Sequence, residues 1–266
     1  MDEHIDAPQV PPESLYLYGH KRAADDIKEL ARQLEAPKII LGGHDWGGSI
    51  VFRVALWHPD LVTHIFSVCT PYFPPTKDWV SLDDLVKRLP SLRYQVHLAG
   101  PEIEAHVKSK TEIKQFLNAM FGGRGPNGEV GFNTAEGIAL DVLPKLGKTP
   151  LLSEQELDHY VEEYAKHGMH GPLNWYRTRQ QNYEDELELS NSTISQPVLF
   201  ISAARDAALP PALAQGMDHF IPHLTKKQVE AGHWALVQAA KHVNAFVGEW
   251  LSQVGFAEEG GGKSTL

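Results

Sequence analysis

Residues 41–51, LGGHDWGGSIV, place a carboxylate, Asp45, on a glycine-rich turn between two apolar segments. The segment before the turn, KIILGG at 38–43, predicts a short buried strand, and residues 47–57 predict a helix. Residues 63–69, THIFSVC, predict a second buried strand. The order strand, helix, strand with short connections indicates a parallel sheet, so the sequence predicts an α/β fold.

The strand pattern stops after this region and returns near the C-terminus, with PVLFISA at 197–203 and KKQVEA at 226–231. The long stretch between, residues 71–195, has no strong strand pattern. Its apolar spacing predicts helices, which we interpret as a helical insertion. Other predicted helices cover 20–35, 210–220 and 239–252, and within the insertion 101–121, 153–167 and 173–187. The expected division is 1–72 and 194–254 for the core, 73–193 for a helical cap and 255–266 for a disordered tail.

Composition excludes several classes of partner. The chain has 266 residues, 42% of them hydrophobic, and a net charge of -10, which disfavours nucleic acid and anionic membranes. No apolar run has the roughly 18 to 20 residues of a membrane helix, so we expect no membrane span. The polar, proline-rich start is not a secretory signal, and the single cysteine fits a cytoplasmic protein. The final Ser264-Thr265-Leu266 resembles a peroxisomal signal only weakly.

The turn itself has a chemical interpretation. Gly43 to Gly47 follow the form G-x-nucleophile-x-G, with Asp45 at the position where serine is usual. Such a sharp turn presents one side chain at the carboxyl edge of the sheet, and a carboxylate there can attack carbon to form an ester. The alternative is that Asp45 only caps the helix that follows, a role in which aspartate is common.

Two further residues follow predicted strands in the order that this chemistry needs. Asp206 comes just after the strand at 197–203, and His233 comes just after the strand at 226–231. A nucleophile, then an acid, then a histidine is the chain order of α/β hydrolases. In that arrangement the histidine activates water and the acid orients the histidine.

With these residues in place, the chain resembles the α/β-hydrolase-fold epoxide hydrolases. The resemblance rests on GHDWGG at 43–48, GHW at 232–234 and GPLNWYR at 171–177, and it extends over about residues 14–253. It implies a mostly parallel sheet with a helical cap. It also implies two cap tyrosines, here Tyr94 and Tyr176.

The resemblance implies a reaction as well. Asp45 would attack a carbon of a small hydrophobic epoxide while Tyr94 and Tyr176 protonate the oxygen. His233, oriented by Asp206, would then activate water to release a vicinal diol. The backbone N–H of Trp46 would stabilise the oxyanion, and Trp46 and Trp175 would line the pocket. No metal or organic cofactor is implied.

The sequence departs from the family pattern in one region. The H-G-x-P loop, which gives family members a second oxyanion donor, is absent, and the first strands of the fold have no counterpart in this sequence. The strand at 38–43 would therefore lie at an edge of the sheet. Two alternatives stay open: a catalytically impaired relative with a binding or regulatory role, and a haloalkane or haloacid dehalogenase. The oligomeric state is also open, with a homodimer as one option.

Overall fold

The computed structural model describes residues 12–255. The strands are β1 (Ile39–His44), β2 (Val62–Val68), β3 (Phe132–Asn133), β4 (Gly137–Ile138), β5 (Val198–Ala203) and β6 (Leu224–Val229). The α-helices are α2 (His20–Gln33), α3 (Trp46–Trp57), α4 (Leu82–Arg88), α5 (Tyr94–Ala99), α6 (Glu102–His106), α7 (Lys110–Met120), α8 (Glu154–His167), α9 (His170–Asn174), α10 (Arg179–Glu186), α11 (Ala235–Gln238) and α12 (Ala240–Gln253). Short 3₁₀ helices are η1 (Pro12–Tyr18), η2 (Pro90–Leu92), η3 (Leu143–Lys145), η4 (Pro211–Ala214) and η5 (Met217–His219).

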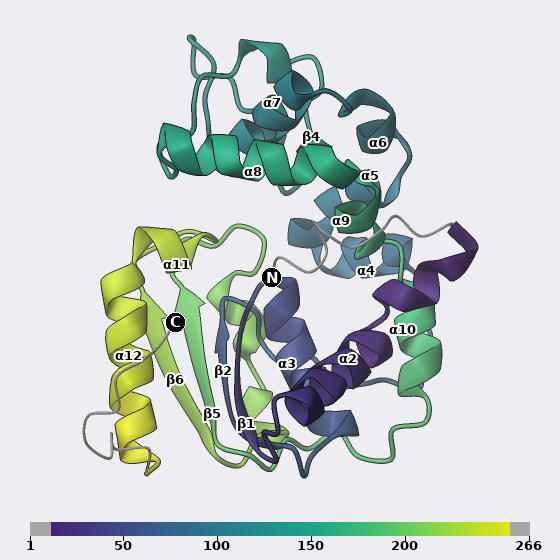
Figure 1. Cartoon of the computed structure of the whole chain (residues 1–266), viewed down its shortest axis with the longest axis vertical. Coiled ribbons are helices and arrows are strands. Elements are labelled where there is room, and N and C mark those ends of the chain that lie inside the picture. Colours follow the sequence, from purple (N-terminus) through teal and green to yellow (C-terminus); the bar gives the residue numbers. More distant parts are fainter. Residues whose placement is uncertain (1–11, 256–266) are drawn as a thin grey trace.

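The central sheet is parallel, as predicted. Its strand order is β1-β2-β5-β6, and each neighbouring pair runs in the same direction. Within residues 12–255, β1 is an edge strand, also as predicted. Figure 1 shows α12 on one side of the sheet and α2 with α3 on the other. The carboxyl ends of all four strands therefore meet at one edge, where the loops that follow them converge.

Both faces of the central strand β5 are buried. Along β5, Leu199 and Ile201 join one apolar cluster that includes Trp250 of α12, while Val198 and Phe200 join another that includes residues of α3. Successive side chains of a strand point to opposite faces, so this alternation places the strand between two helical layers. A strand covered on both sides reads as a continuous apolar run, which is why PVLFISA was recognisable in the sequence.

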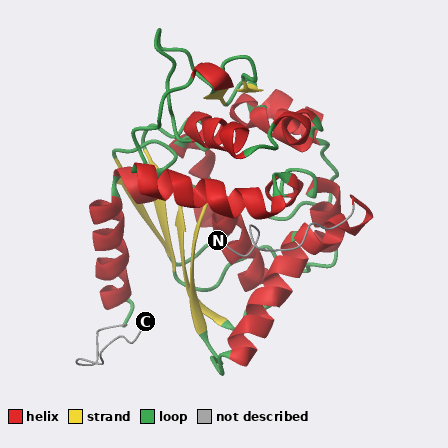
Figure 2. Ribbon diagram, turned by 45° about the horizontal axis from the view of Figure 1, so that its top comes forward, coloured by secondary structure: helices red, strands yellow, loops and turns green. Residues whose placement is uncertain are grey.

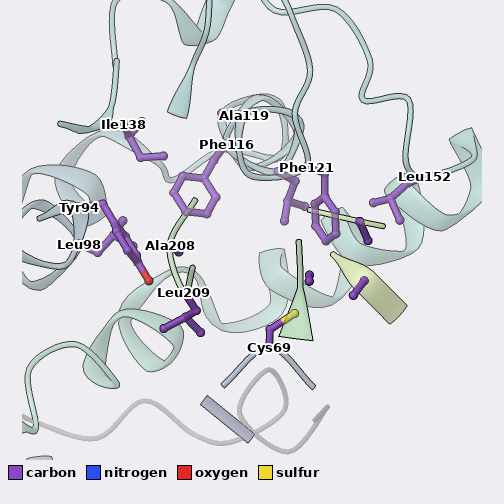
Figure 3. Close-up of a cluster of buried hydrophobic side chains, with 14 of the residues drawn as sticks. Cys69, Tyr94, Leu98, Phe116, Ala119, Phe121, Ile138, Leu152, Ala208 and Leu209 are labelled. Atoms are coloured by element: carbon purple, nitrogen blue, oxygen red, sulfur yellow. The ribbon is translucent and has the colours of Figure 1, made fainter. Parts of the chain in front are cut away.

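Of the helices between β2 and β5, α4 to α9 form a layer above the carboxyl edge of the sheet, whereas α10 lies beside α2 (Figure 1). Figure 2, which distinguishes helices from strands, shows this layer as helices joined by long loops, with the small β3–β4 hairpin among them. A shared apolar cluster joins it to the sheet: Phe116 and Phe121 from the cap lie near Cys69 and Leu209 from the core loops (Figure 3). The segment between β2 and β5 therefore packs on the sheet through this shared apolar cluster.

Four details differ from the sequence predictions. The expected helix near 210–220 is wrong: the segment contains only η4 and η5, because the adjacent prolines favour a turn and Gly216 has a left-handed φ of 82°. The segment 71–195 contains a small antiparallel hairpin, β3 with β4. The predicted helix 101–121 is split into α6 and α7, and 173–187 into α9 and α10.

The described residues stop short of both ends of the chain. Most of the predicted disordered tail, 256–266, lies outside the described residues, as does 1–11. Among the helices of residues 12–255, none combines the length and apolarity required to cross a membrane.

Candidate active site

Asp45 sits on a strained turn between β1 and α3. Its φ of 54° and ψ of -123° are unusual for a residue with a side chain. The turn is possible because glycines flank it: a Cβ on Gly43 would lie 2.2 Å from the carbonyl oxygen of Gly47. Oδ2 of Asp45 accepts a hydrogen bond from the Trp46 N–H at 2.6 Å. The side chain thus does cap α3, as the simpler interpretation held, and it also faces a cavity.

The three strand-end residues chosen from the sequence come together. Nε2 of His233 lies 3.0 Å from Oδ1 of Asp45, and Nδ1 lies 2.9 Å from Oδ2 of Asp206. Asp206 is fully buried as a side chain, and its second oxygen accepts the N–H groups of Ala208 and Leu209, each at 2.9 Å. The imidazole is therefore held between two carboxylates, one fixed by the backbone and one on the cavity side.

Sequence reasoning did not find the residues that hold the His233 loop. The carbonyl oxygen of His233 accepts a hydrogen bond from Nε2 of His44 at 2.8 Å and another from the Cys69 thiol at 3.3 Å. Thr70 donates from its hydroxyl to the Asp45 carbonyl at 2.6 Å. All three contacts join the ends of separate strands, so no local pattern could have indicated them.

The charges of the triad depend on one another. Burial alone would lower the pKa of His233, but its hydrogen bonds with Asp206 and Asp45 outweigh burial and raise that pKa to about 10. Burial alone would raise the pKa values of Asp45 and Asp206, yet their contacts with His233 lower both. The resting site therefore holds an imidazolium between two carboxylates at neutral pH.

Both cap tyrosines reach this site. Tyr94 begins α5, Tyr176 follows α9, and their ring centroids lie 6.1 Å apart. Tyr176 also meets the Trp46 ring edge-on at 5.5 Å. Burial, followed for Tyr94 by the Asp45 charge and for Tyr176 by Tyr94 and then Asp45, raises the pKa of each phenol, so both remain proton donors.

A cavity of about 450 Å³ contains these groups. Asp45, Tyr94 and Tyr176 line it, together with the predicted pocket residues Trp46 and Trp175. Apolar side chains from the cap cover much of the remaining wall: Val80, Leu82, Leu85, Leu89 and Leu92. The site can thus hold a small, largely apolar molecule against one carboxylate and two phenols.

The sequence lacks the H-G-x-P loop that supplies a second oxyanion donor, and the described part of the structure likewise shows a single backbone donor at Asp45. Within residues 12–255, the structure pairs no second backbone N–H with the Asp45 carboxylate beyond that of Trp46.

The ligand atoms of His44, Cys69 and His233 lie within 4.8 Å of one another, a spacing a metal could use. The thiol and the His44 ring nitrogen are committed to the His233 carbonyl, however, and both His233 nitrogens face carboxylates. This donor set fits a hydrogen-bonded loop better than a metal centre.

These features define an α/β hydrolase with a carboxylate at the nucleophile position. Asp45 lies on the strand-to-helix turn, His233 and Asp206 lie at neighbouring strand ends, and helices cover the site. Comparison with known proteins agrees. Residues 9–96 match the family model described as the alpha/beta hydrolase fold. Epoxide hydrolase srdG of Neurospora crassa is 39% identical over 259 residues, which cover 93% of this chain and 75% of that protein. The chain belongs to the epoxide hydrolase family.

Other relatives are more distant or longer. Bifunctional epoxide hydrolase 2 of Rattus norvegicus is 28% identical over 247 residues, and the chain spans 44% of that protein's length. The crystal structure of epoxide hydrolase A from Mycobacterium thermoresistibile superimposes with a TM-score of 0.74 at 25% identity, covering 91% of this chain and 78% of that one.

Proposed function

We propose that this protein adds water to an epoxide to give a vicinal diol, through a covalent ester on Asp45. The observation that carries the proposal is the 3.0 Å contact of His233 with Asp45, in a cavity that Tyr94 and Tyr176 also line. A nucleophile, a water-activating base and an acid for the leaving oxygen are the three groups that ring opening by this route needs.

In the first step, a carboxylate oxygen of Asp45 attacks an epoxide carbon, and the bond from that carbon to oxygen breaks. The oxygen takes a proton from Tyr94 or Tyr176, whose raised phenol pKa values keep them protonated at neutral pH. The product is a hydroxyalkyl ester and a tyrosinate.

Ester formation changes the state of His233. The ester is neutral, so His233 loses the Asp45 half of the interaction that raises its pKa. Its proton then passes to the tyrosinate, and the neutral imidazole becomes a base. Formation of the covalent ester therefore converts His233 into the base that hydrolyses the ester.

In the second step, neutral His233 takes one proton from water, and the hydroxide attacks the ester carbonyl. The Trp46 N–H, already 2.6 Å from an oxygen of Asp45, stabilises the oxyanion. The intermediate collapses and expels the diol oxygen, which takes the second proton of the water. Asp45 returns as a carboxylate and His233 as an imidazolium, so the cycle is balanced.

A dehalogenase would use the same three residues, since it too forms an aspartyl ester. It would have no use for two phenols that line the same cavity as the nucleophile, which is why we favour the epoxide. We further propose a cytoplasmic setting, in which the lone thiol of Cys69 stays reduced. A homodimer is compatible with this function and is not needed for it.

The test is hydrolysis of styrene oxide by this chain beside Asp45→Ala, after both show a cooperative melt. Diol formation that disappears in Asp45→Ala supports the proposal. A folded chain that leaves styrene oxide intact but releases halide from a haloalkane would favour the dehalogenase. A folded chain inert to both would favour a binding or regulatory role.

A further inference from the structure

The active-site cavity has a polar region apart from the triad. Four buried polar side chains make up this region of the cavity wall: His20 at the start of α2, Arg53 from α3, and Asn182 and Glu186 from α10. Their residues are only 6% to 8% exposed to solvent. Buried polar atoms are almost always hydrogen-bonded in folded proteins, so an unpaired atom in this cluster points to a missing partner.

Three of the four side chains are satisfied within the protein. Arg53 donates from Nε and Nη2 to the two oxygens of Glu186, at 2.7 and 3.2 Å, and from Nη1 to the Phe73 carbonyl at 2.9 Å. Asn182 accepts the backbone N–H of His20 at 2.8 Å and donates to the Thr178 hydroxyl at 3.3 Å. These bonds fix the cluster between core and cap.

His20 is the exception. Its Nδ1 lies 3.6 Å from Oε1 of Glu186, an electrostatic contact longer than a hydrogen bond. Its Nε2 is buried and has no hydrogen-bond partner in the described part of the chain. Leaving such an atom unpaired is costly, so a ligand group that pairs with it would gain binding energy.

The surroundings decide what Nε2 can accept. Burial lowers the pKa of His20, the nearby Glu186 opposes that change, and the charge of Arg53 adds to it, so the ring is neutral. Glu186 faces Nδ1, and a carboxylate can only accept, so the single ring proton belongs on Nδ1. Nε2 then offers a lone pair, which calls for a donor such as a hydroxyl.

We propose that Nε2 of His20 accepts a hydrogen bond from a hydroxyl group on the non-reacting part of the substrate, so that the site prefers epoxides that carry a free hydroxyl. The inference rests on the proposed function and deepens it. The His20 ring lies 6.0 Å from the Trp46 ring, and Trp46 follows Asp45 directly. The substrate would thus extend along the Trp46 indole, from the nucleophile to His20.

The test compares two ligands that differ only in a donor. Styrene oxides with a hydroxymethyl group, at the meta or para position, are set against their methoxymethyl counterparts. For the better isomer we expect kcat/KM to favour the free hydroxyl about tenfold, since the ether cannot donate to Nε2. Equal values for both isomers would overturn the inference, because they would mean that water alone satisfies His20.

Two variants locate the effect. His20→Gln can place its amide oxygen near the position of Nε2, whereas the shorter His20→Asn reaches only the position of Nδ1. We expect the preference for the hydroxyl to persist in His20→Gln and to fall to about one in His20→Asn. A preference unchanged in His20→Asn would contradict the assignment, and the wild-type comparison keeps its force if a variant fails to fold.

A binding measurement separates this inference from the proposed function. The diols made from the same epoxides are titrated into the wild-type chain and followed by tryptophan fluorescence. Tighter binding of the free-hydroxyl diol, in a chain that turns over no epoxide, would leave the His20 site standing while the proposed reaction fails. Turnover of both epoxides with equal affinity for both diols would support the proposed reaction and overturn the His20 inference.

Discussion

Nε2 of His233 lies 3.0 Å from Oδ1 of Asp45, so base and nucleophile form an ion pair before any substrate arrives. This contact keeps Asp45 ionised, as a nucleophile must be. It also keeps His233 protonated, and a protonated imidazole cannot take a proton from water. Both conditions reverse once Asp45 becomes an ester. A single contact thus orders the two steps of the proposed reaction, and the order can be tested without substrate.

Removing the Asp45 charge should release the proton of His233. In the wild type, the two carboxylates outweigh burial and raise the pKa of His233 to about 10. In Asp45→Asn, which keeps the shape of the ester, we expect this pKa to fall by about 1 to 3 units, since one opposite charge is lost. Titration of the His233 ring by NMR measures the change. An unchanged value would mean that Asp206 alone sets the proton.

His233→Gln should stop the reaction halfway. Asp45 can still open the epoxide, but the ester has no base to activate water, so it accumulates. Intact-protein mass spectrometry should show one substrate added per chain, and diol release should end after a single turnover. Asp45→Asn, treated in the same way, should show no adduct. Steady diol production by His233→Gln would exclude this histidine as the base.

The two cap tyrosines should share the work of protonating the epoxide oxygen. Because either phenol can donate, Tyr94→Phe and Tyr176→Phe should each lower kcat by about tenfold, and the double variant by about 10² or more. Tyr72→Phe is the matched control: this buried tyrosine donates to the Ser192 carbonyl and lies outside the cavity lining. A double variant no slower than either single variant would argue that only one phenol donates.

The sequence allowed prediction of those parts of the site that lie at strand ends. Asp45, Asp206 and His233 each follow an apolar strand, and parallel topology alone brings such positions together. The cap tyrosines were different: their positions followed only from the resemblance to a family, because helical spacing says nothing about which buried tyrosine faces the nucleophile.

The polar cluster could not have been predicted. His20 and Glu186 are far apart in the sequence and meet only because α10 packs beside α2 (Figure 1). The expected helix at 210–220 failed for a local reason, since its prolines and the left-handed Gly216 favour turns. Strand ends are thus readable from local pattern, whereas contacts between cap and core depend on packing that no short segment encodes.

The Arg53–Glu186 pair should contribute to stability in a pH-dependent way. Burial alone would raise the pKa of Glu186, but His20 and Arg53 outweigh burial and lower it from 4.5 to about 2. Its stabilising effect is therefore complete above about pH 4.5 and is lost as pH falls through about 2. Arg53→Met leaves a buried carboxylate unpaired, so we expect a loss of about 3 to 5 kcal/mol in the free energy of unfolding at pH 7.

Urea unfolding at several pH values measures this effect. The loss in Arg53→Met should shrink as pH is lowered toward 3, because protonation of Glu186 removes the unpaired charge. Arg53→Met combined with Glu186→Leu should cost less than the single change, since no charge is left buried. A loss that does not vary with pH would indicate that packing of the Arg53 side chain matters more than its charge.

Gly43→Ala should damage the nucleophile turn. A Cβ there would lie 2.2 Å from the Gly47 carbonyl oxygen and 2.7 Å from the Gly48 nitrogen. These are backbone atoms of the turn and first residues of α3, so no side-chain rotation relieves the clash. We expect a loss of about 3 kcal/mol in unfolding free energy, together with loss of diol formation, because Asp45 can no longer hold its position opposite His233.

Gly248→Ala provides the matched control for that change. Gly248 lies within α12, and a Cβ on it would meet nothing within 4 Å. The same substitution should there stabilise the chain by about 0.5 to 1 kcal/mol, since alanine favours helix over glycine, and should leave diol formation unchanged. If Gly43→Ala instead melts like the wild type and turns over styrene oxide at the same rate, the turn has more freedom than its contacts imply, and the strained geometry of Asp45 is not what positions the nucleophile.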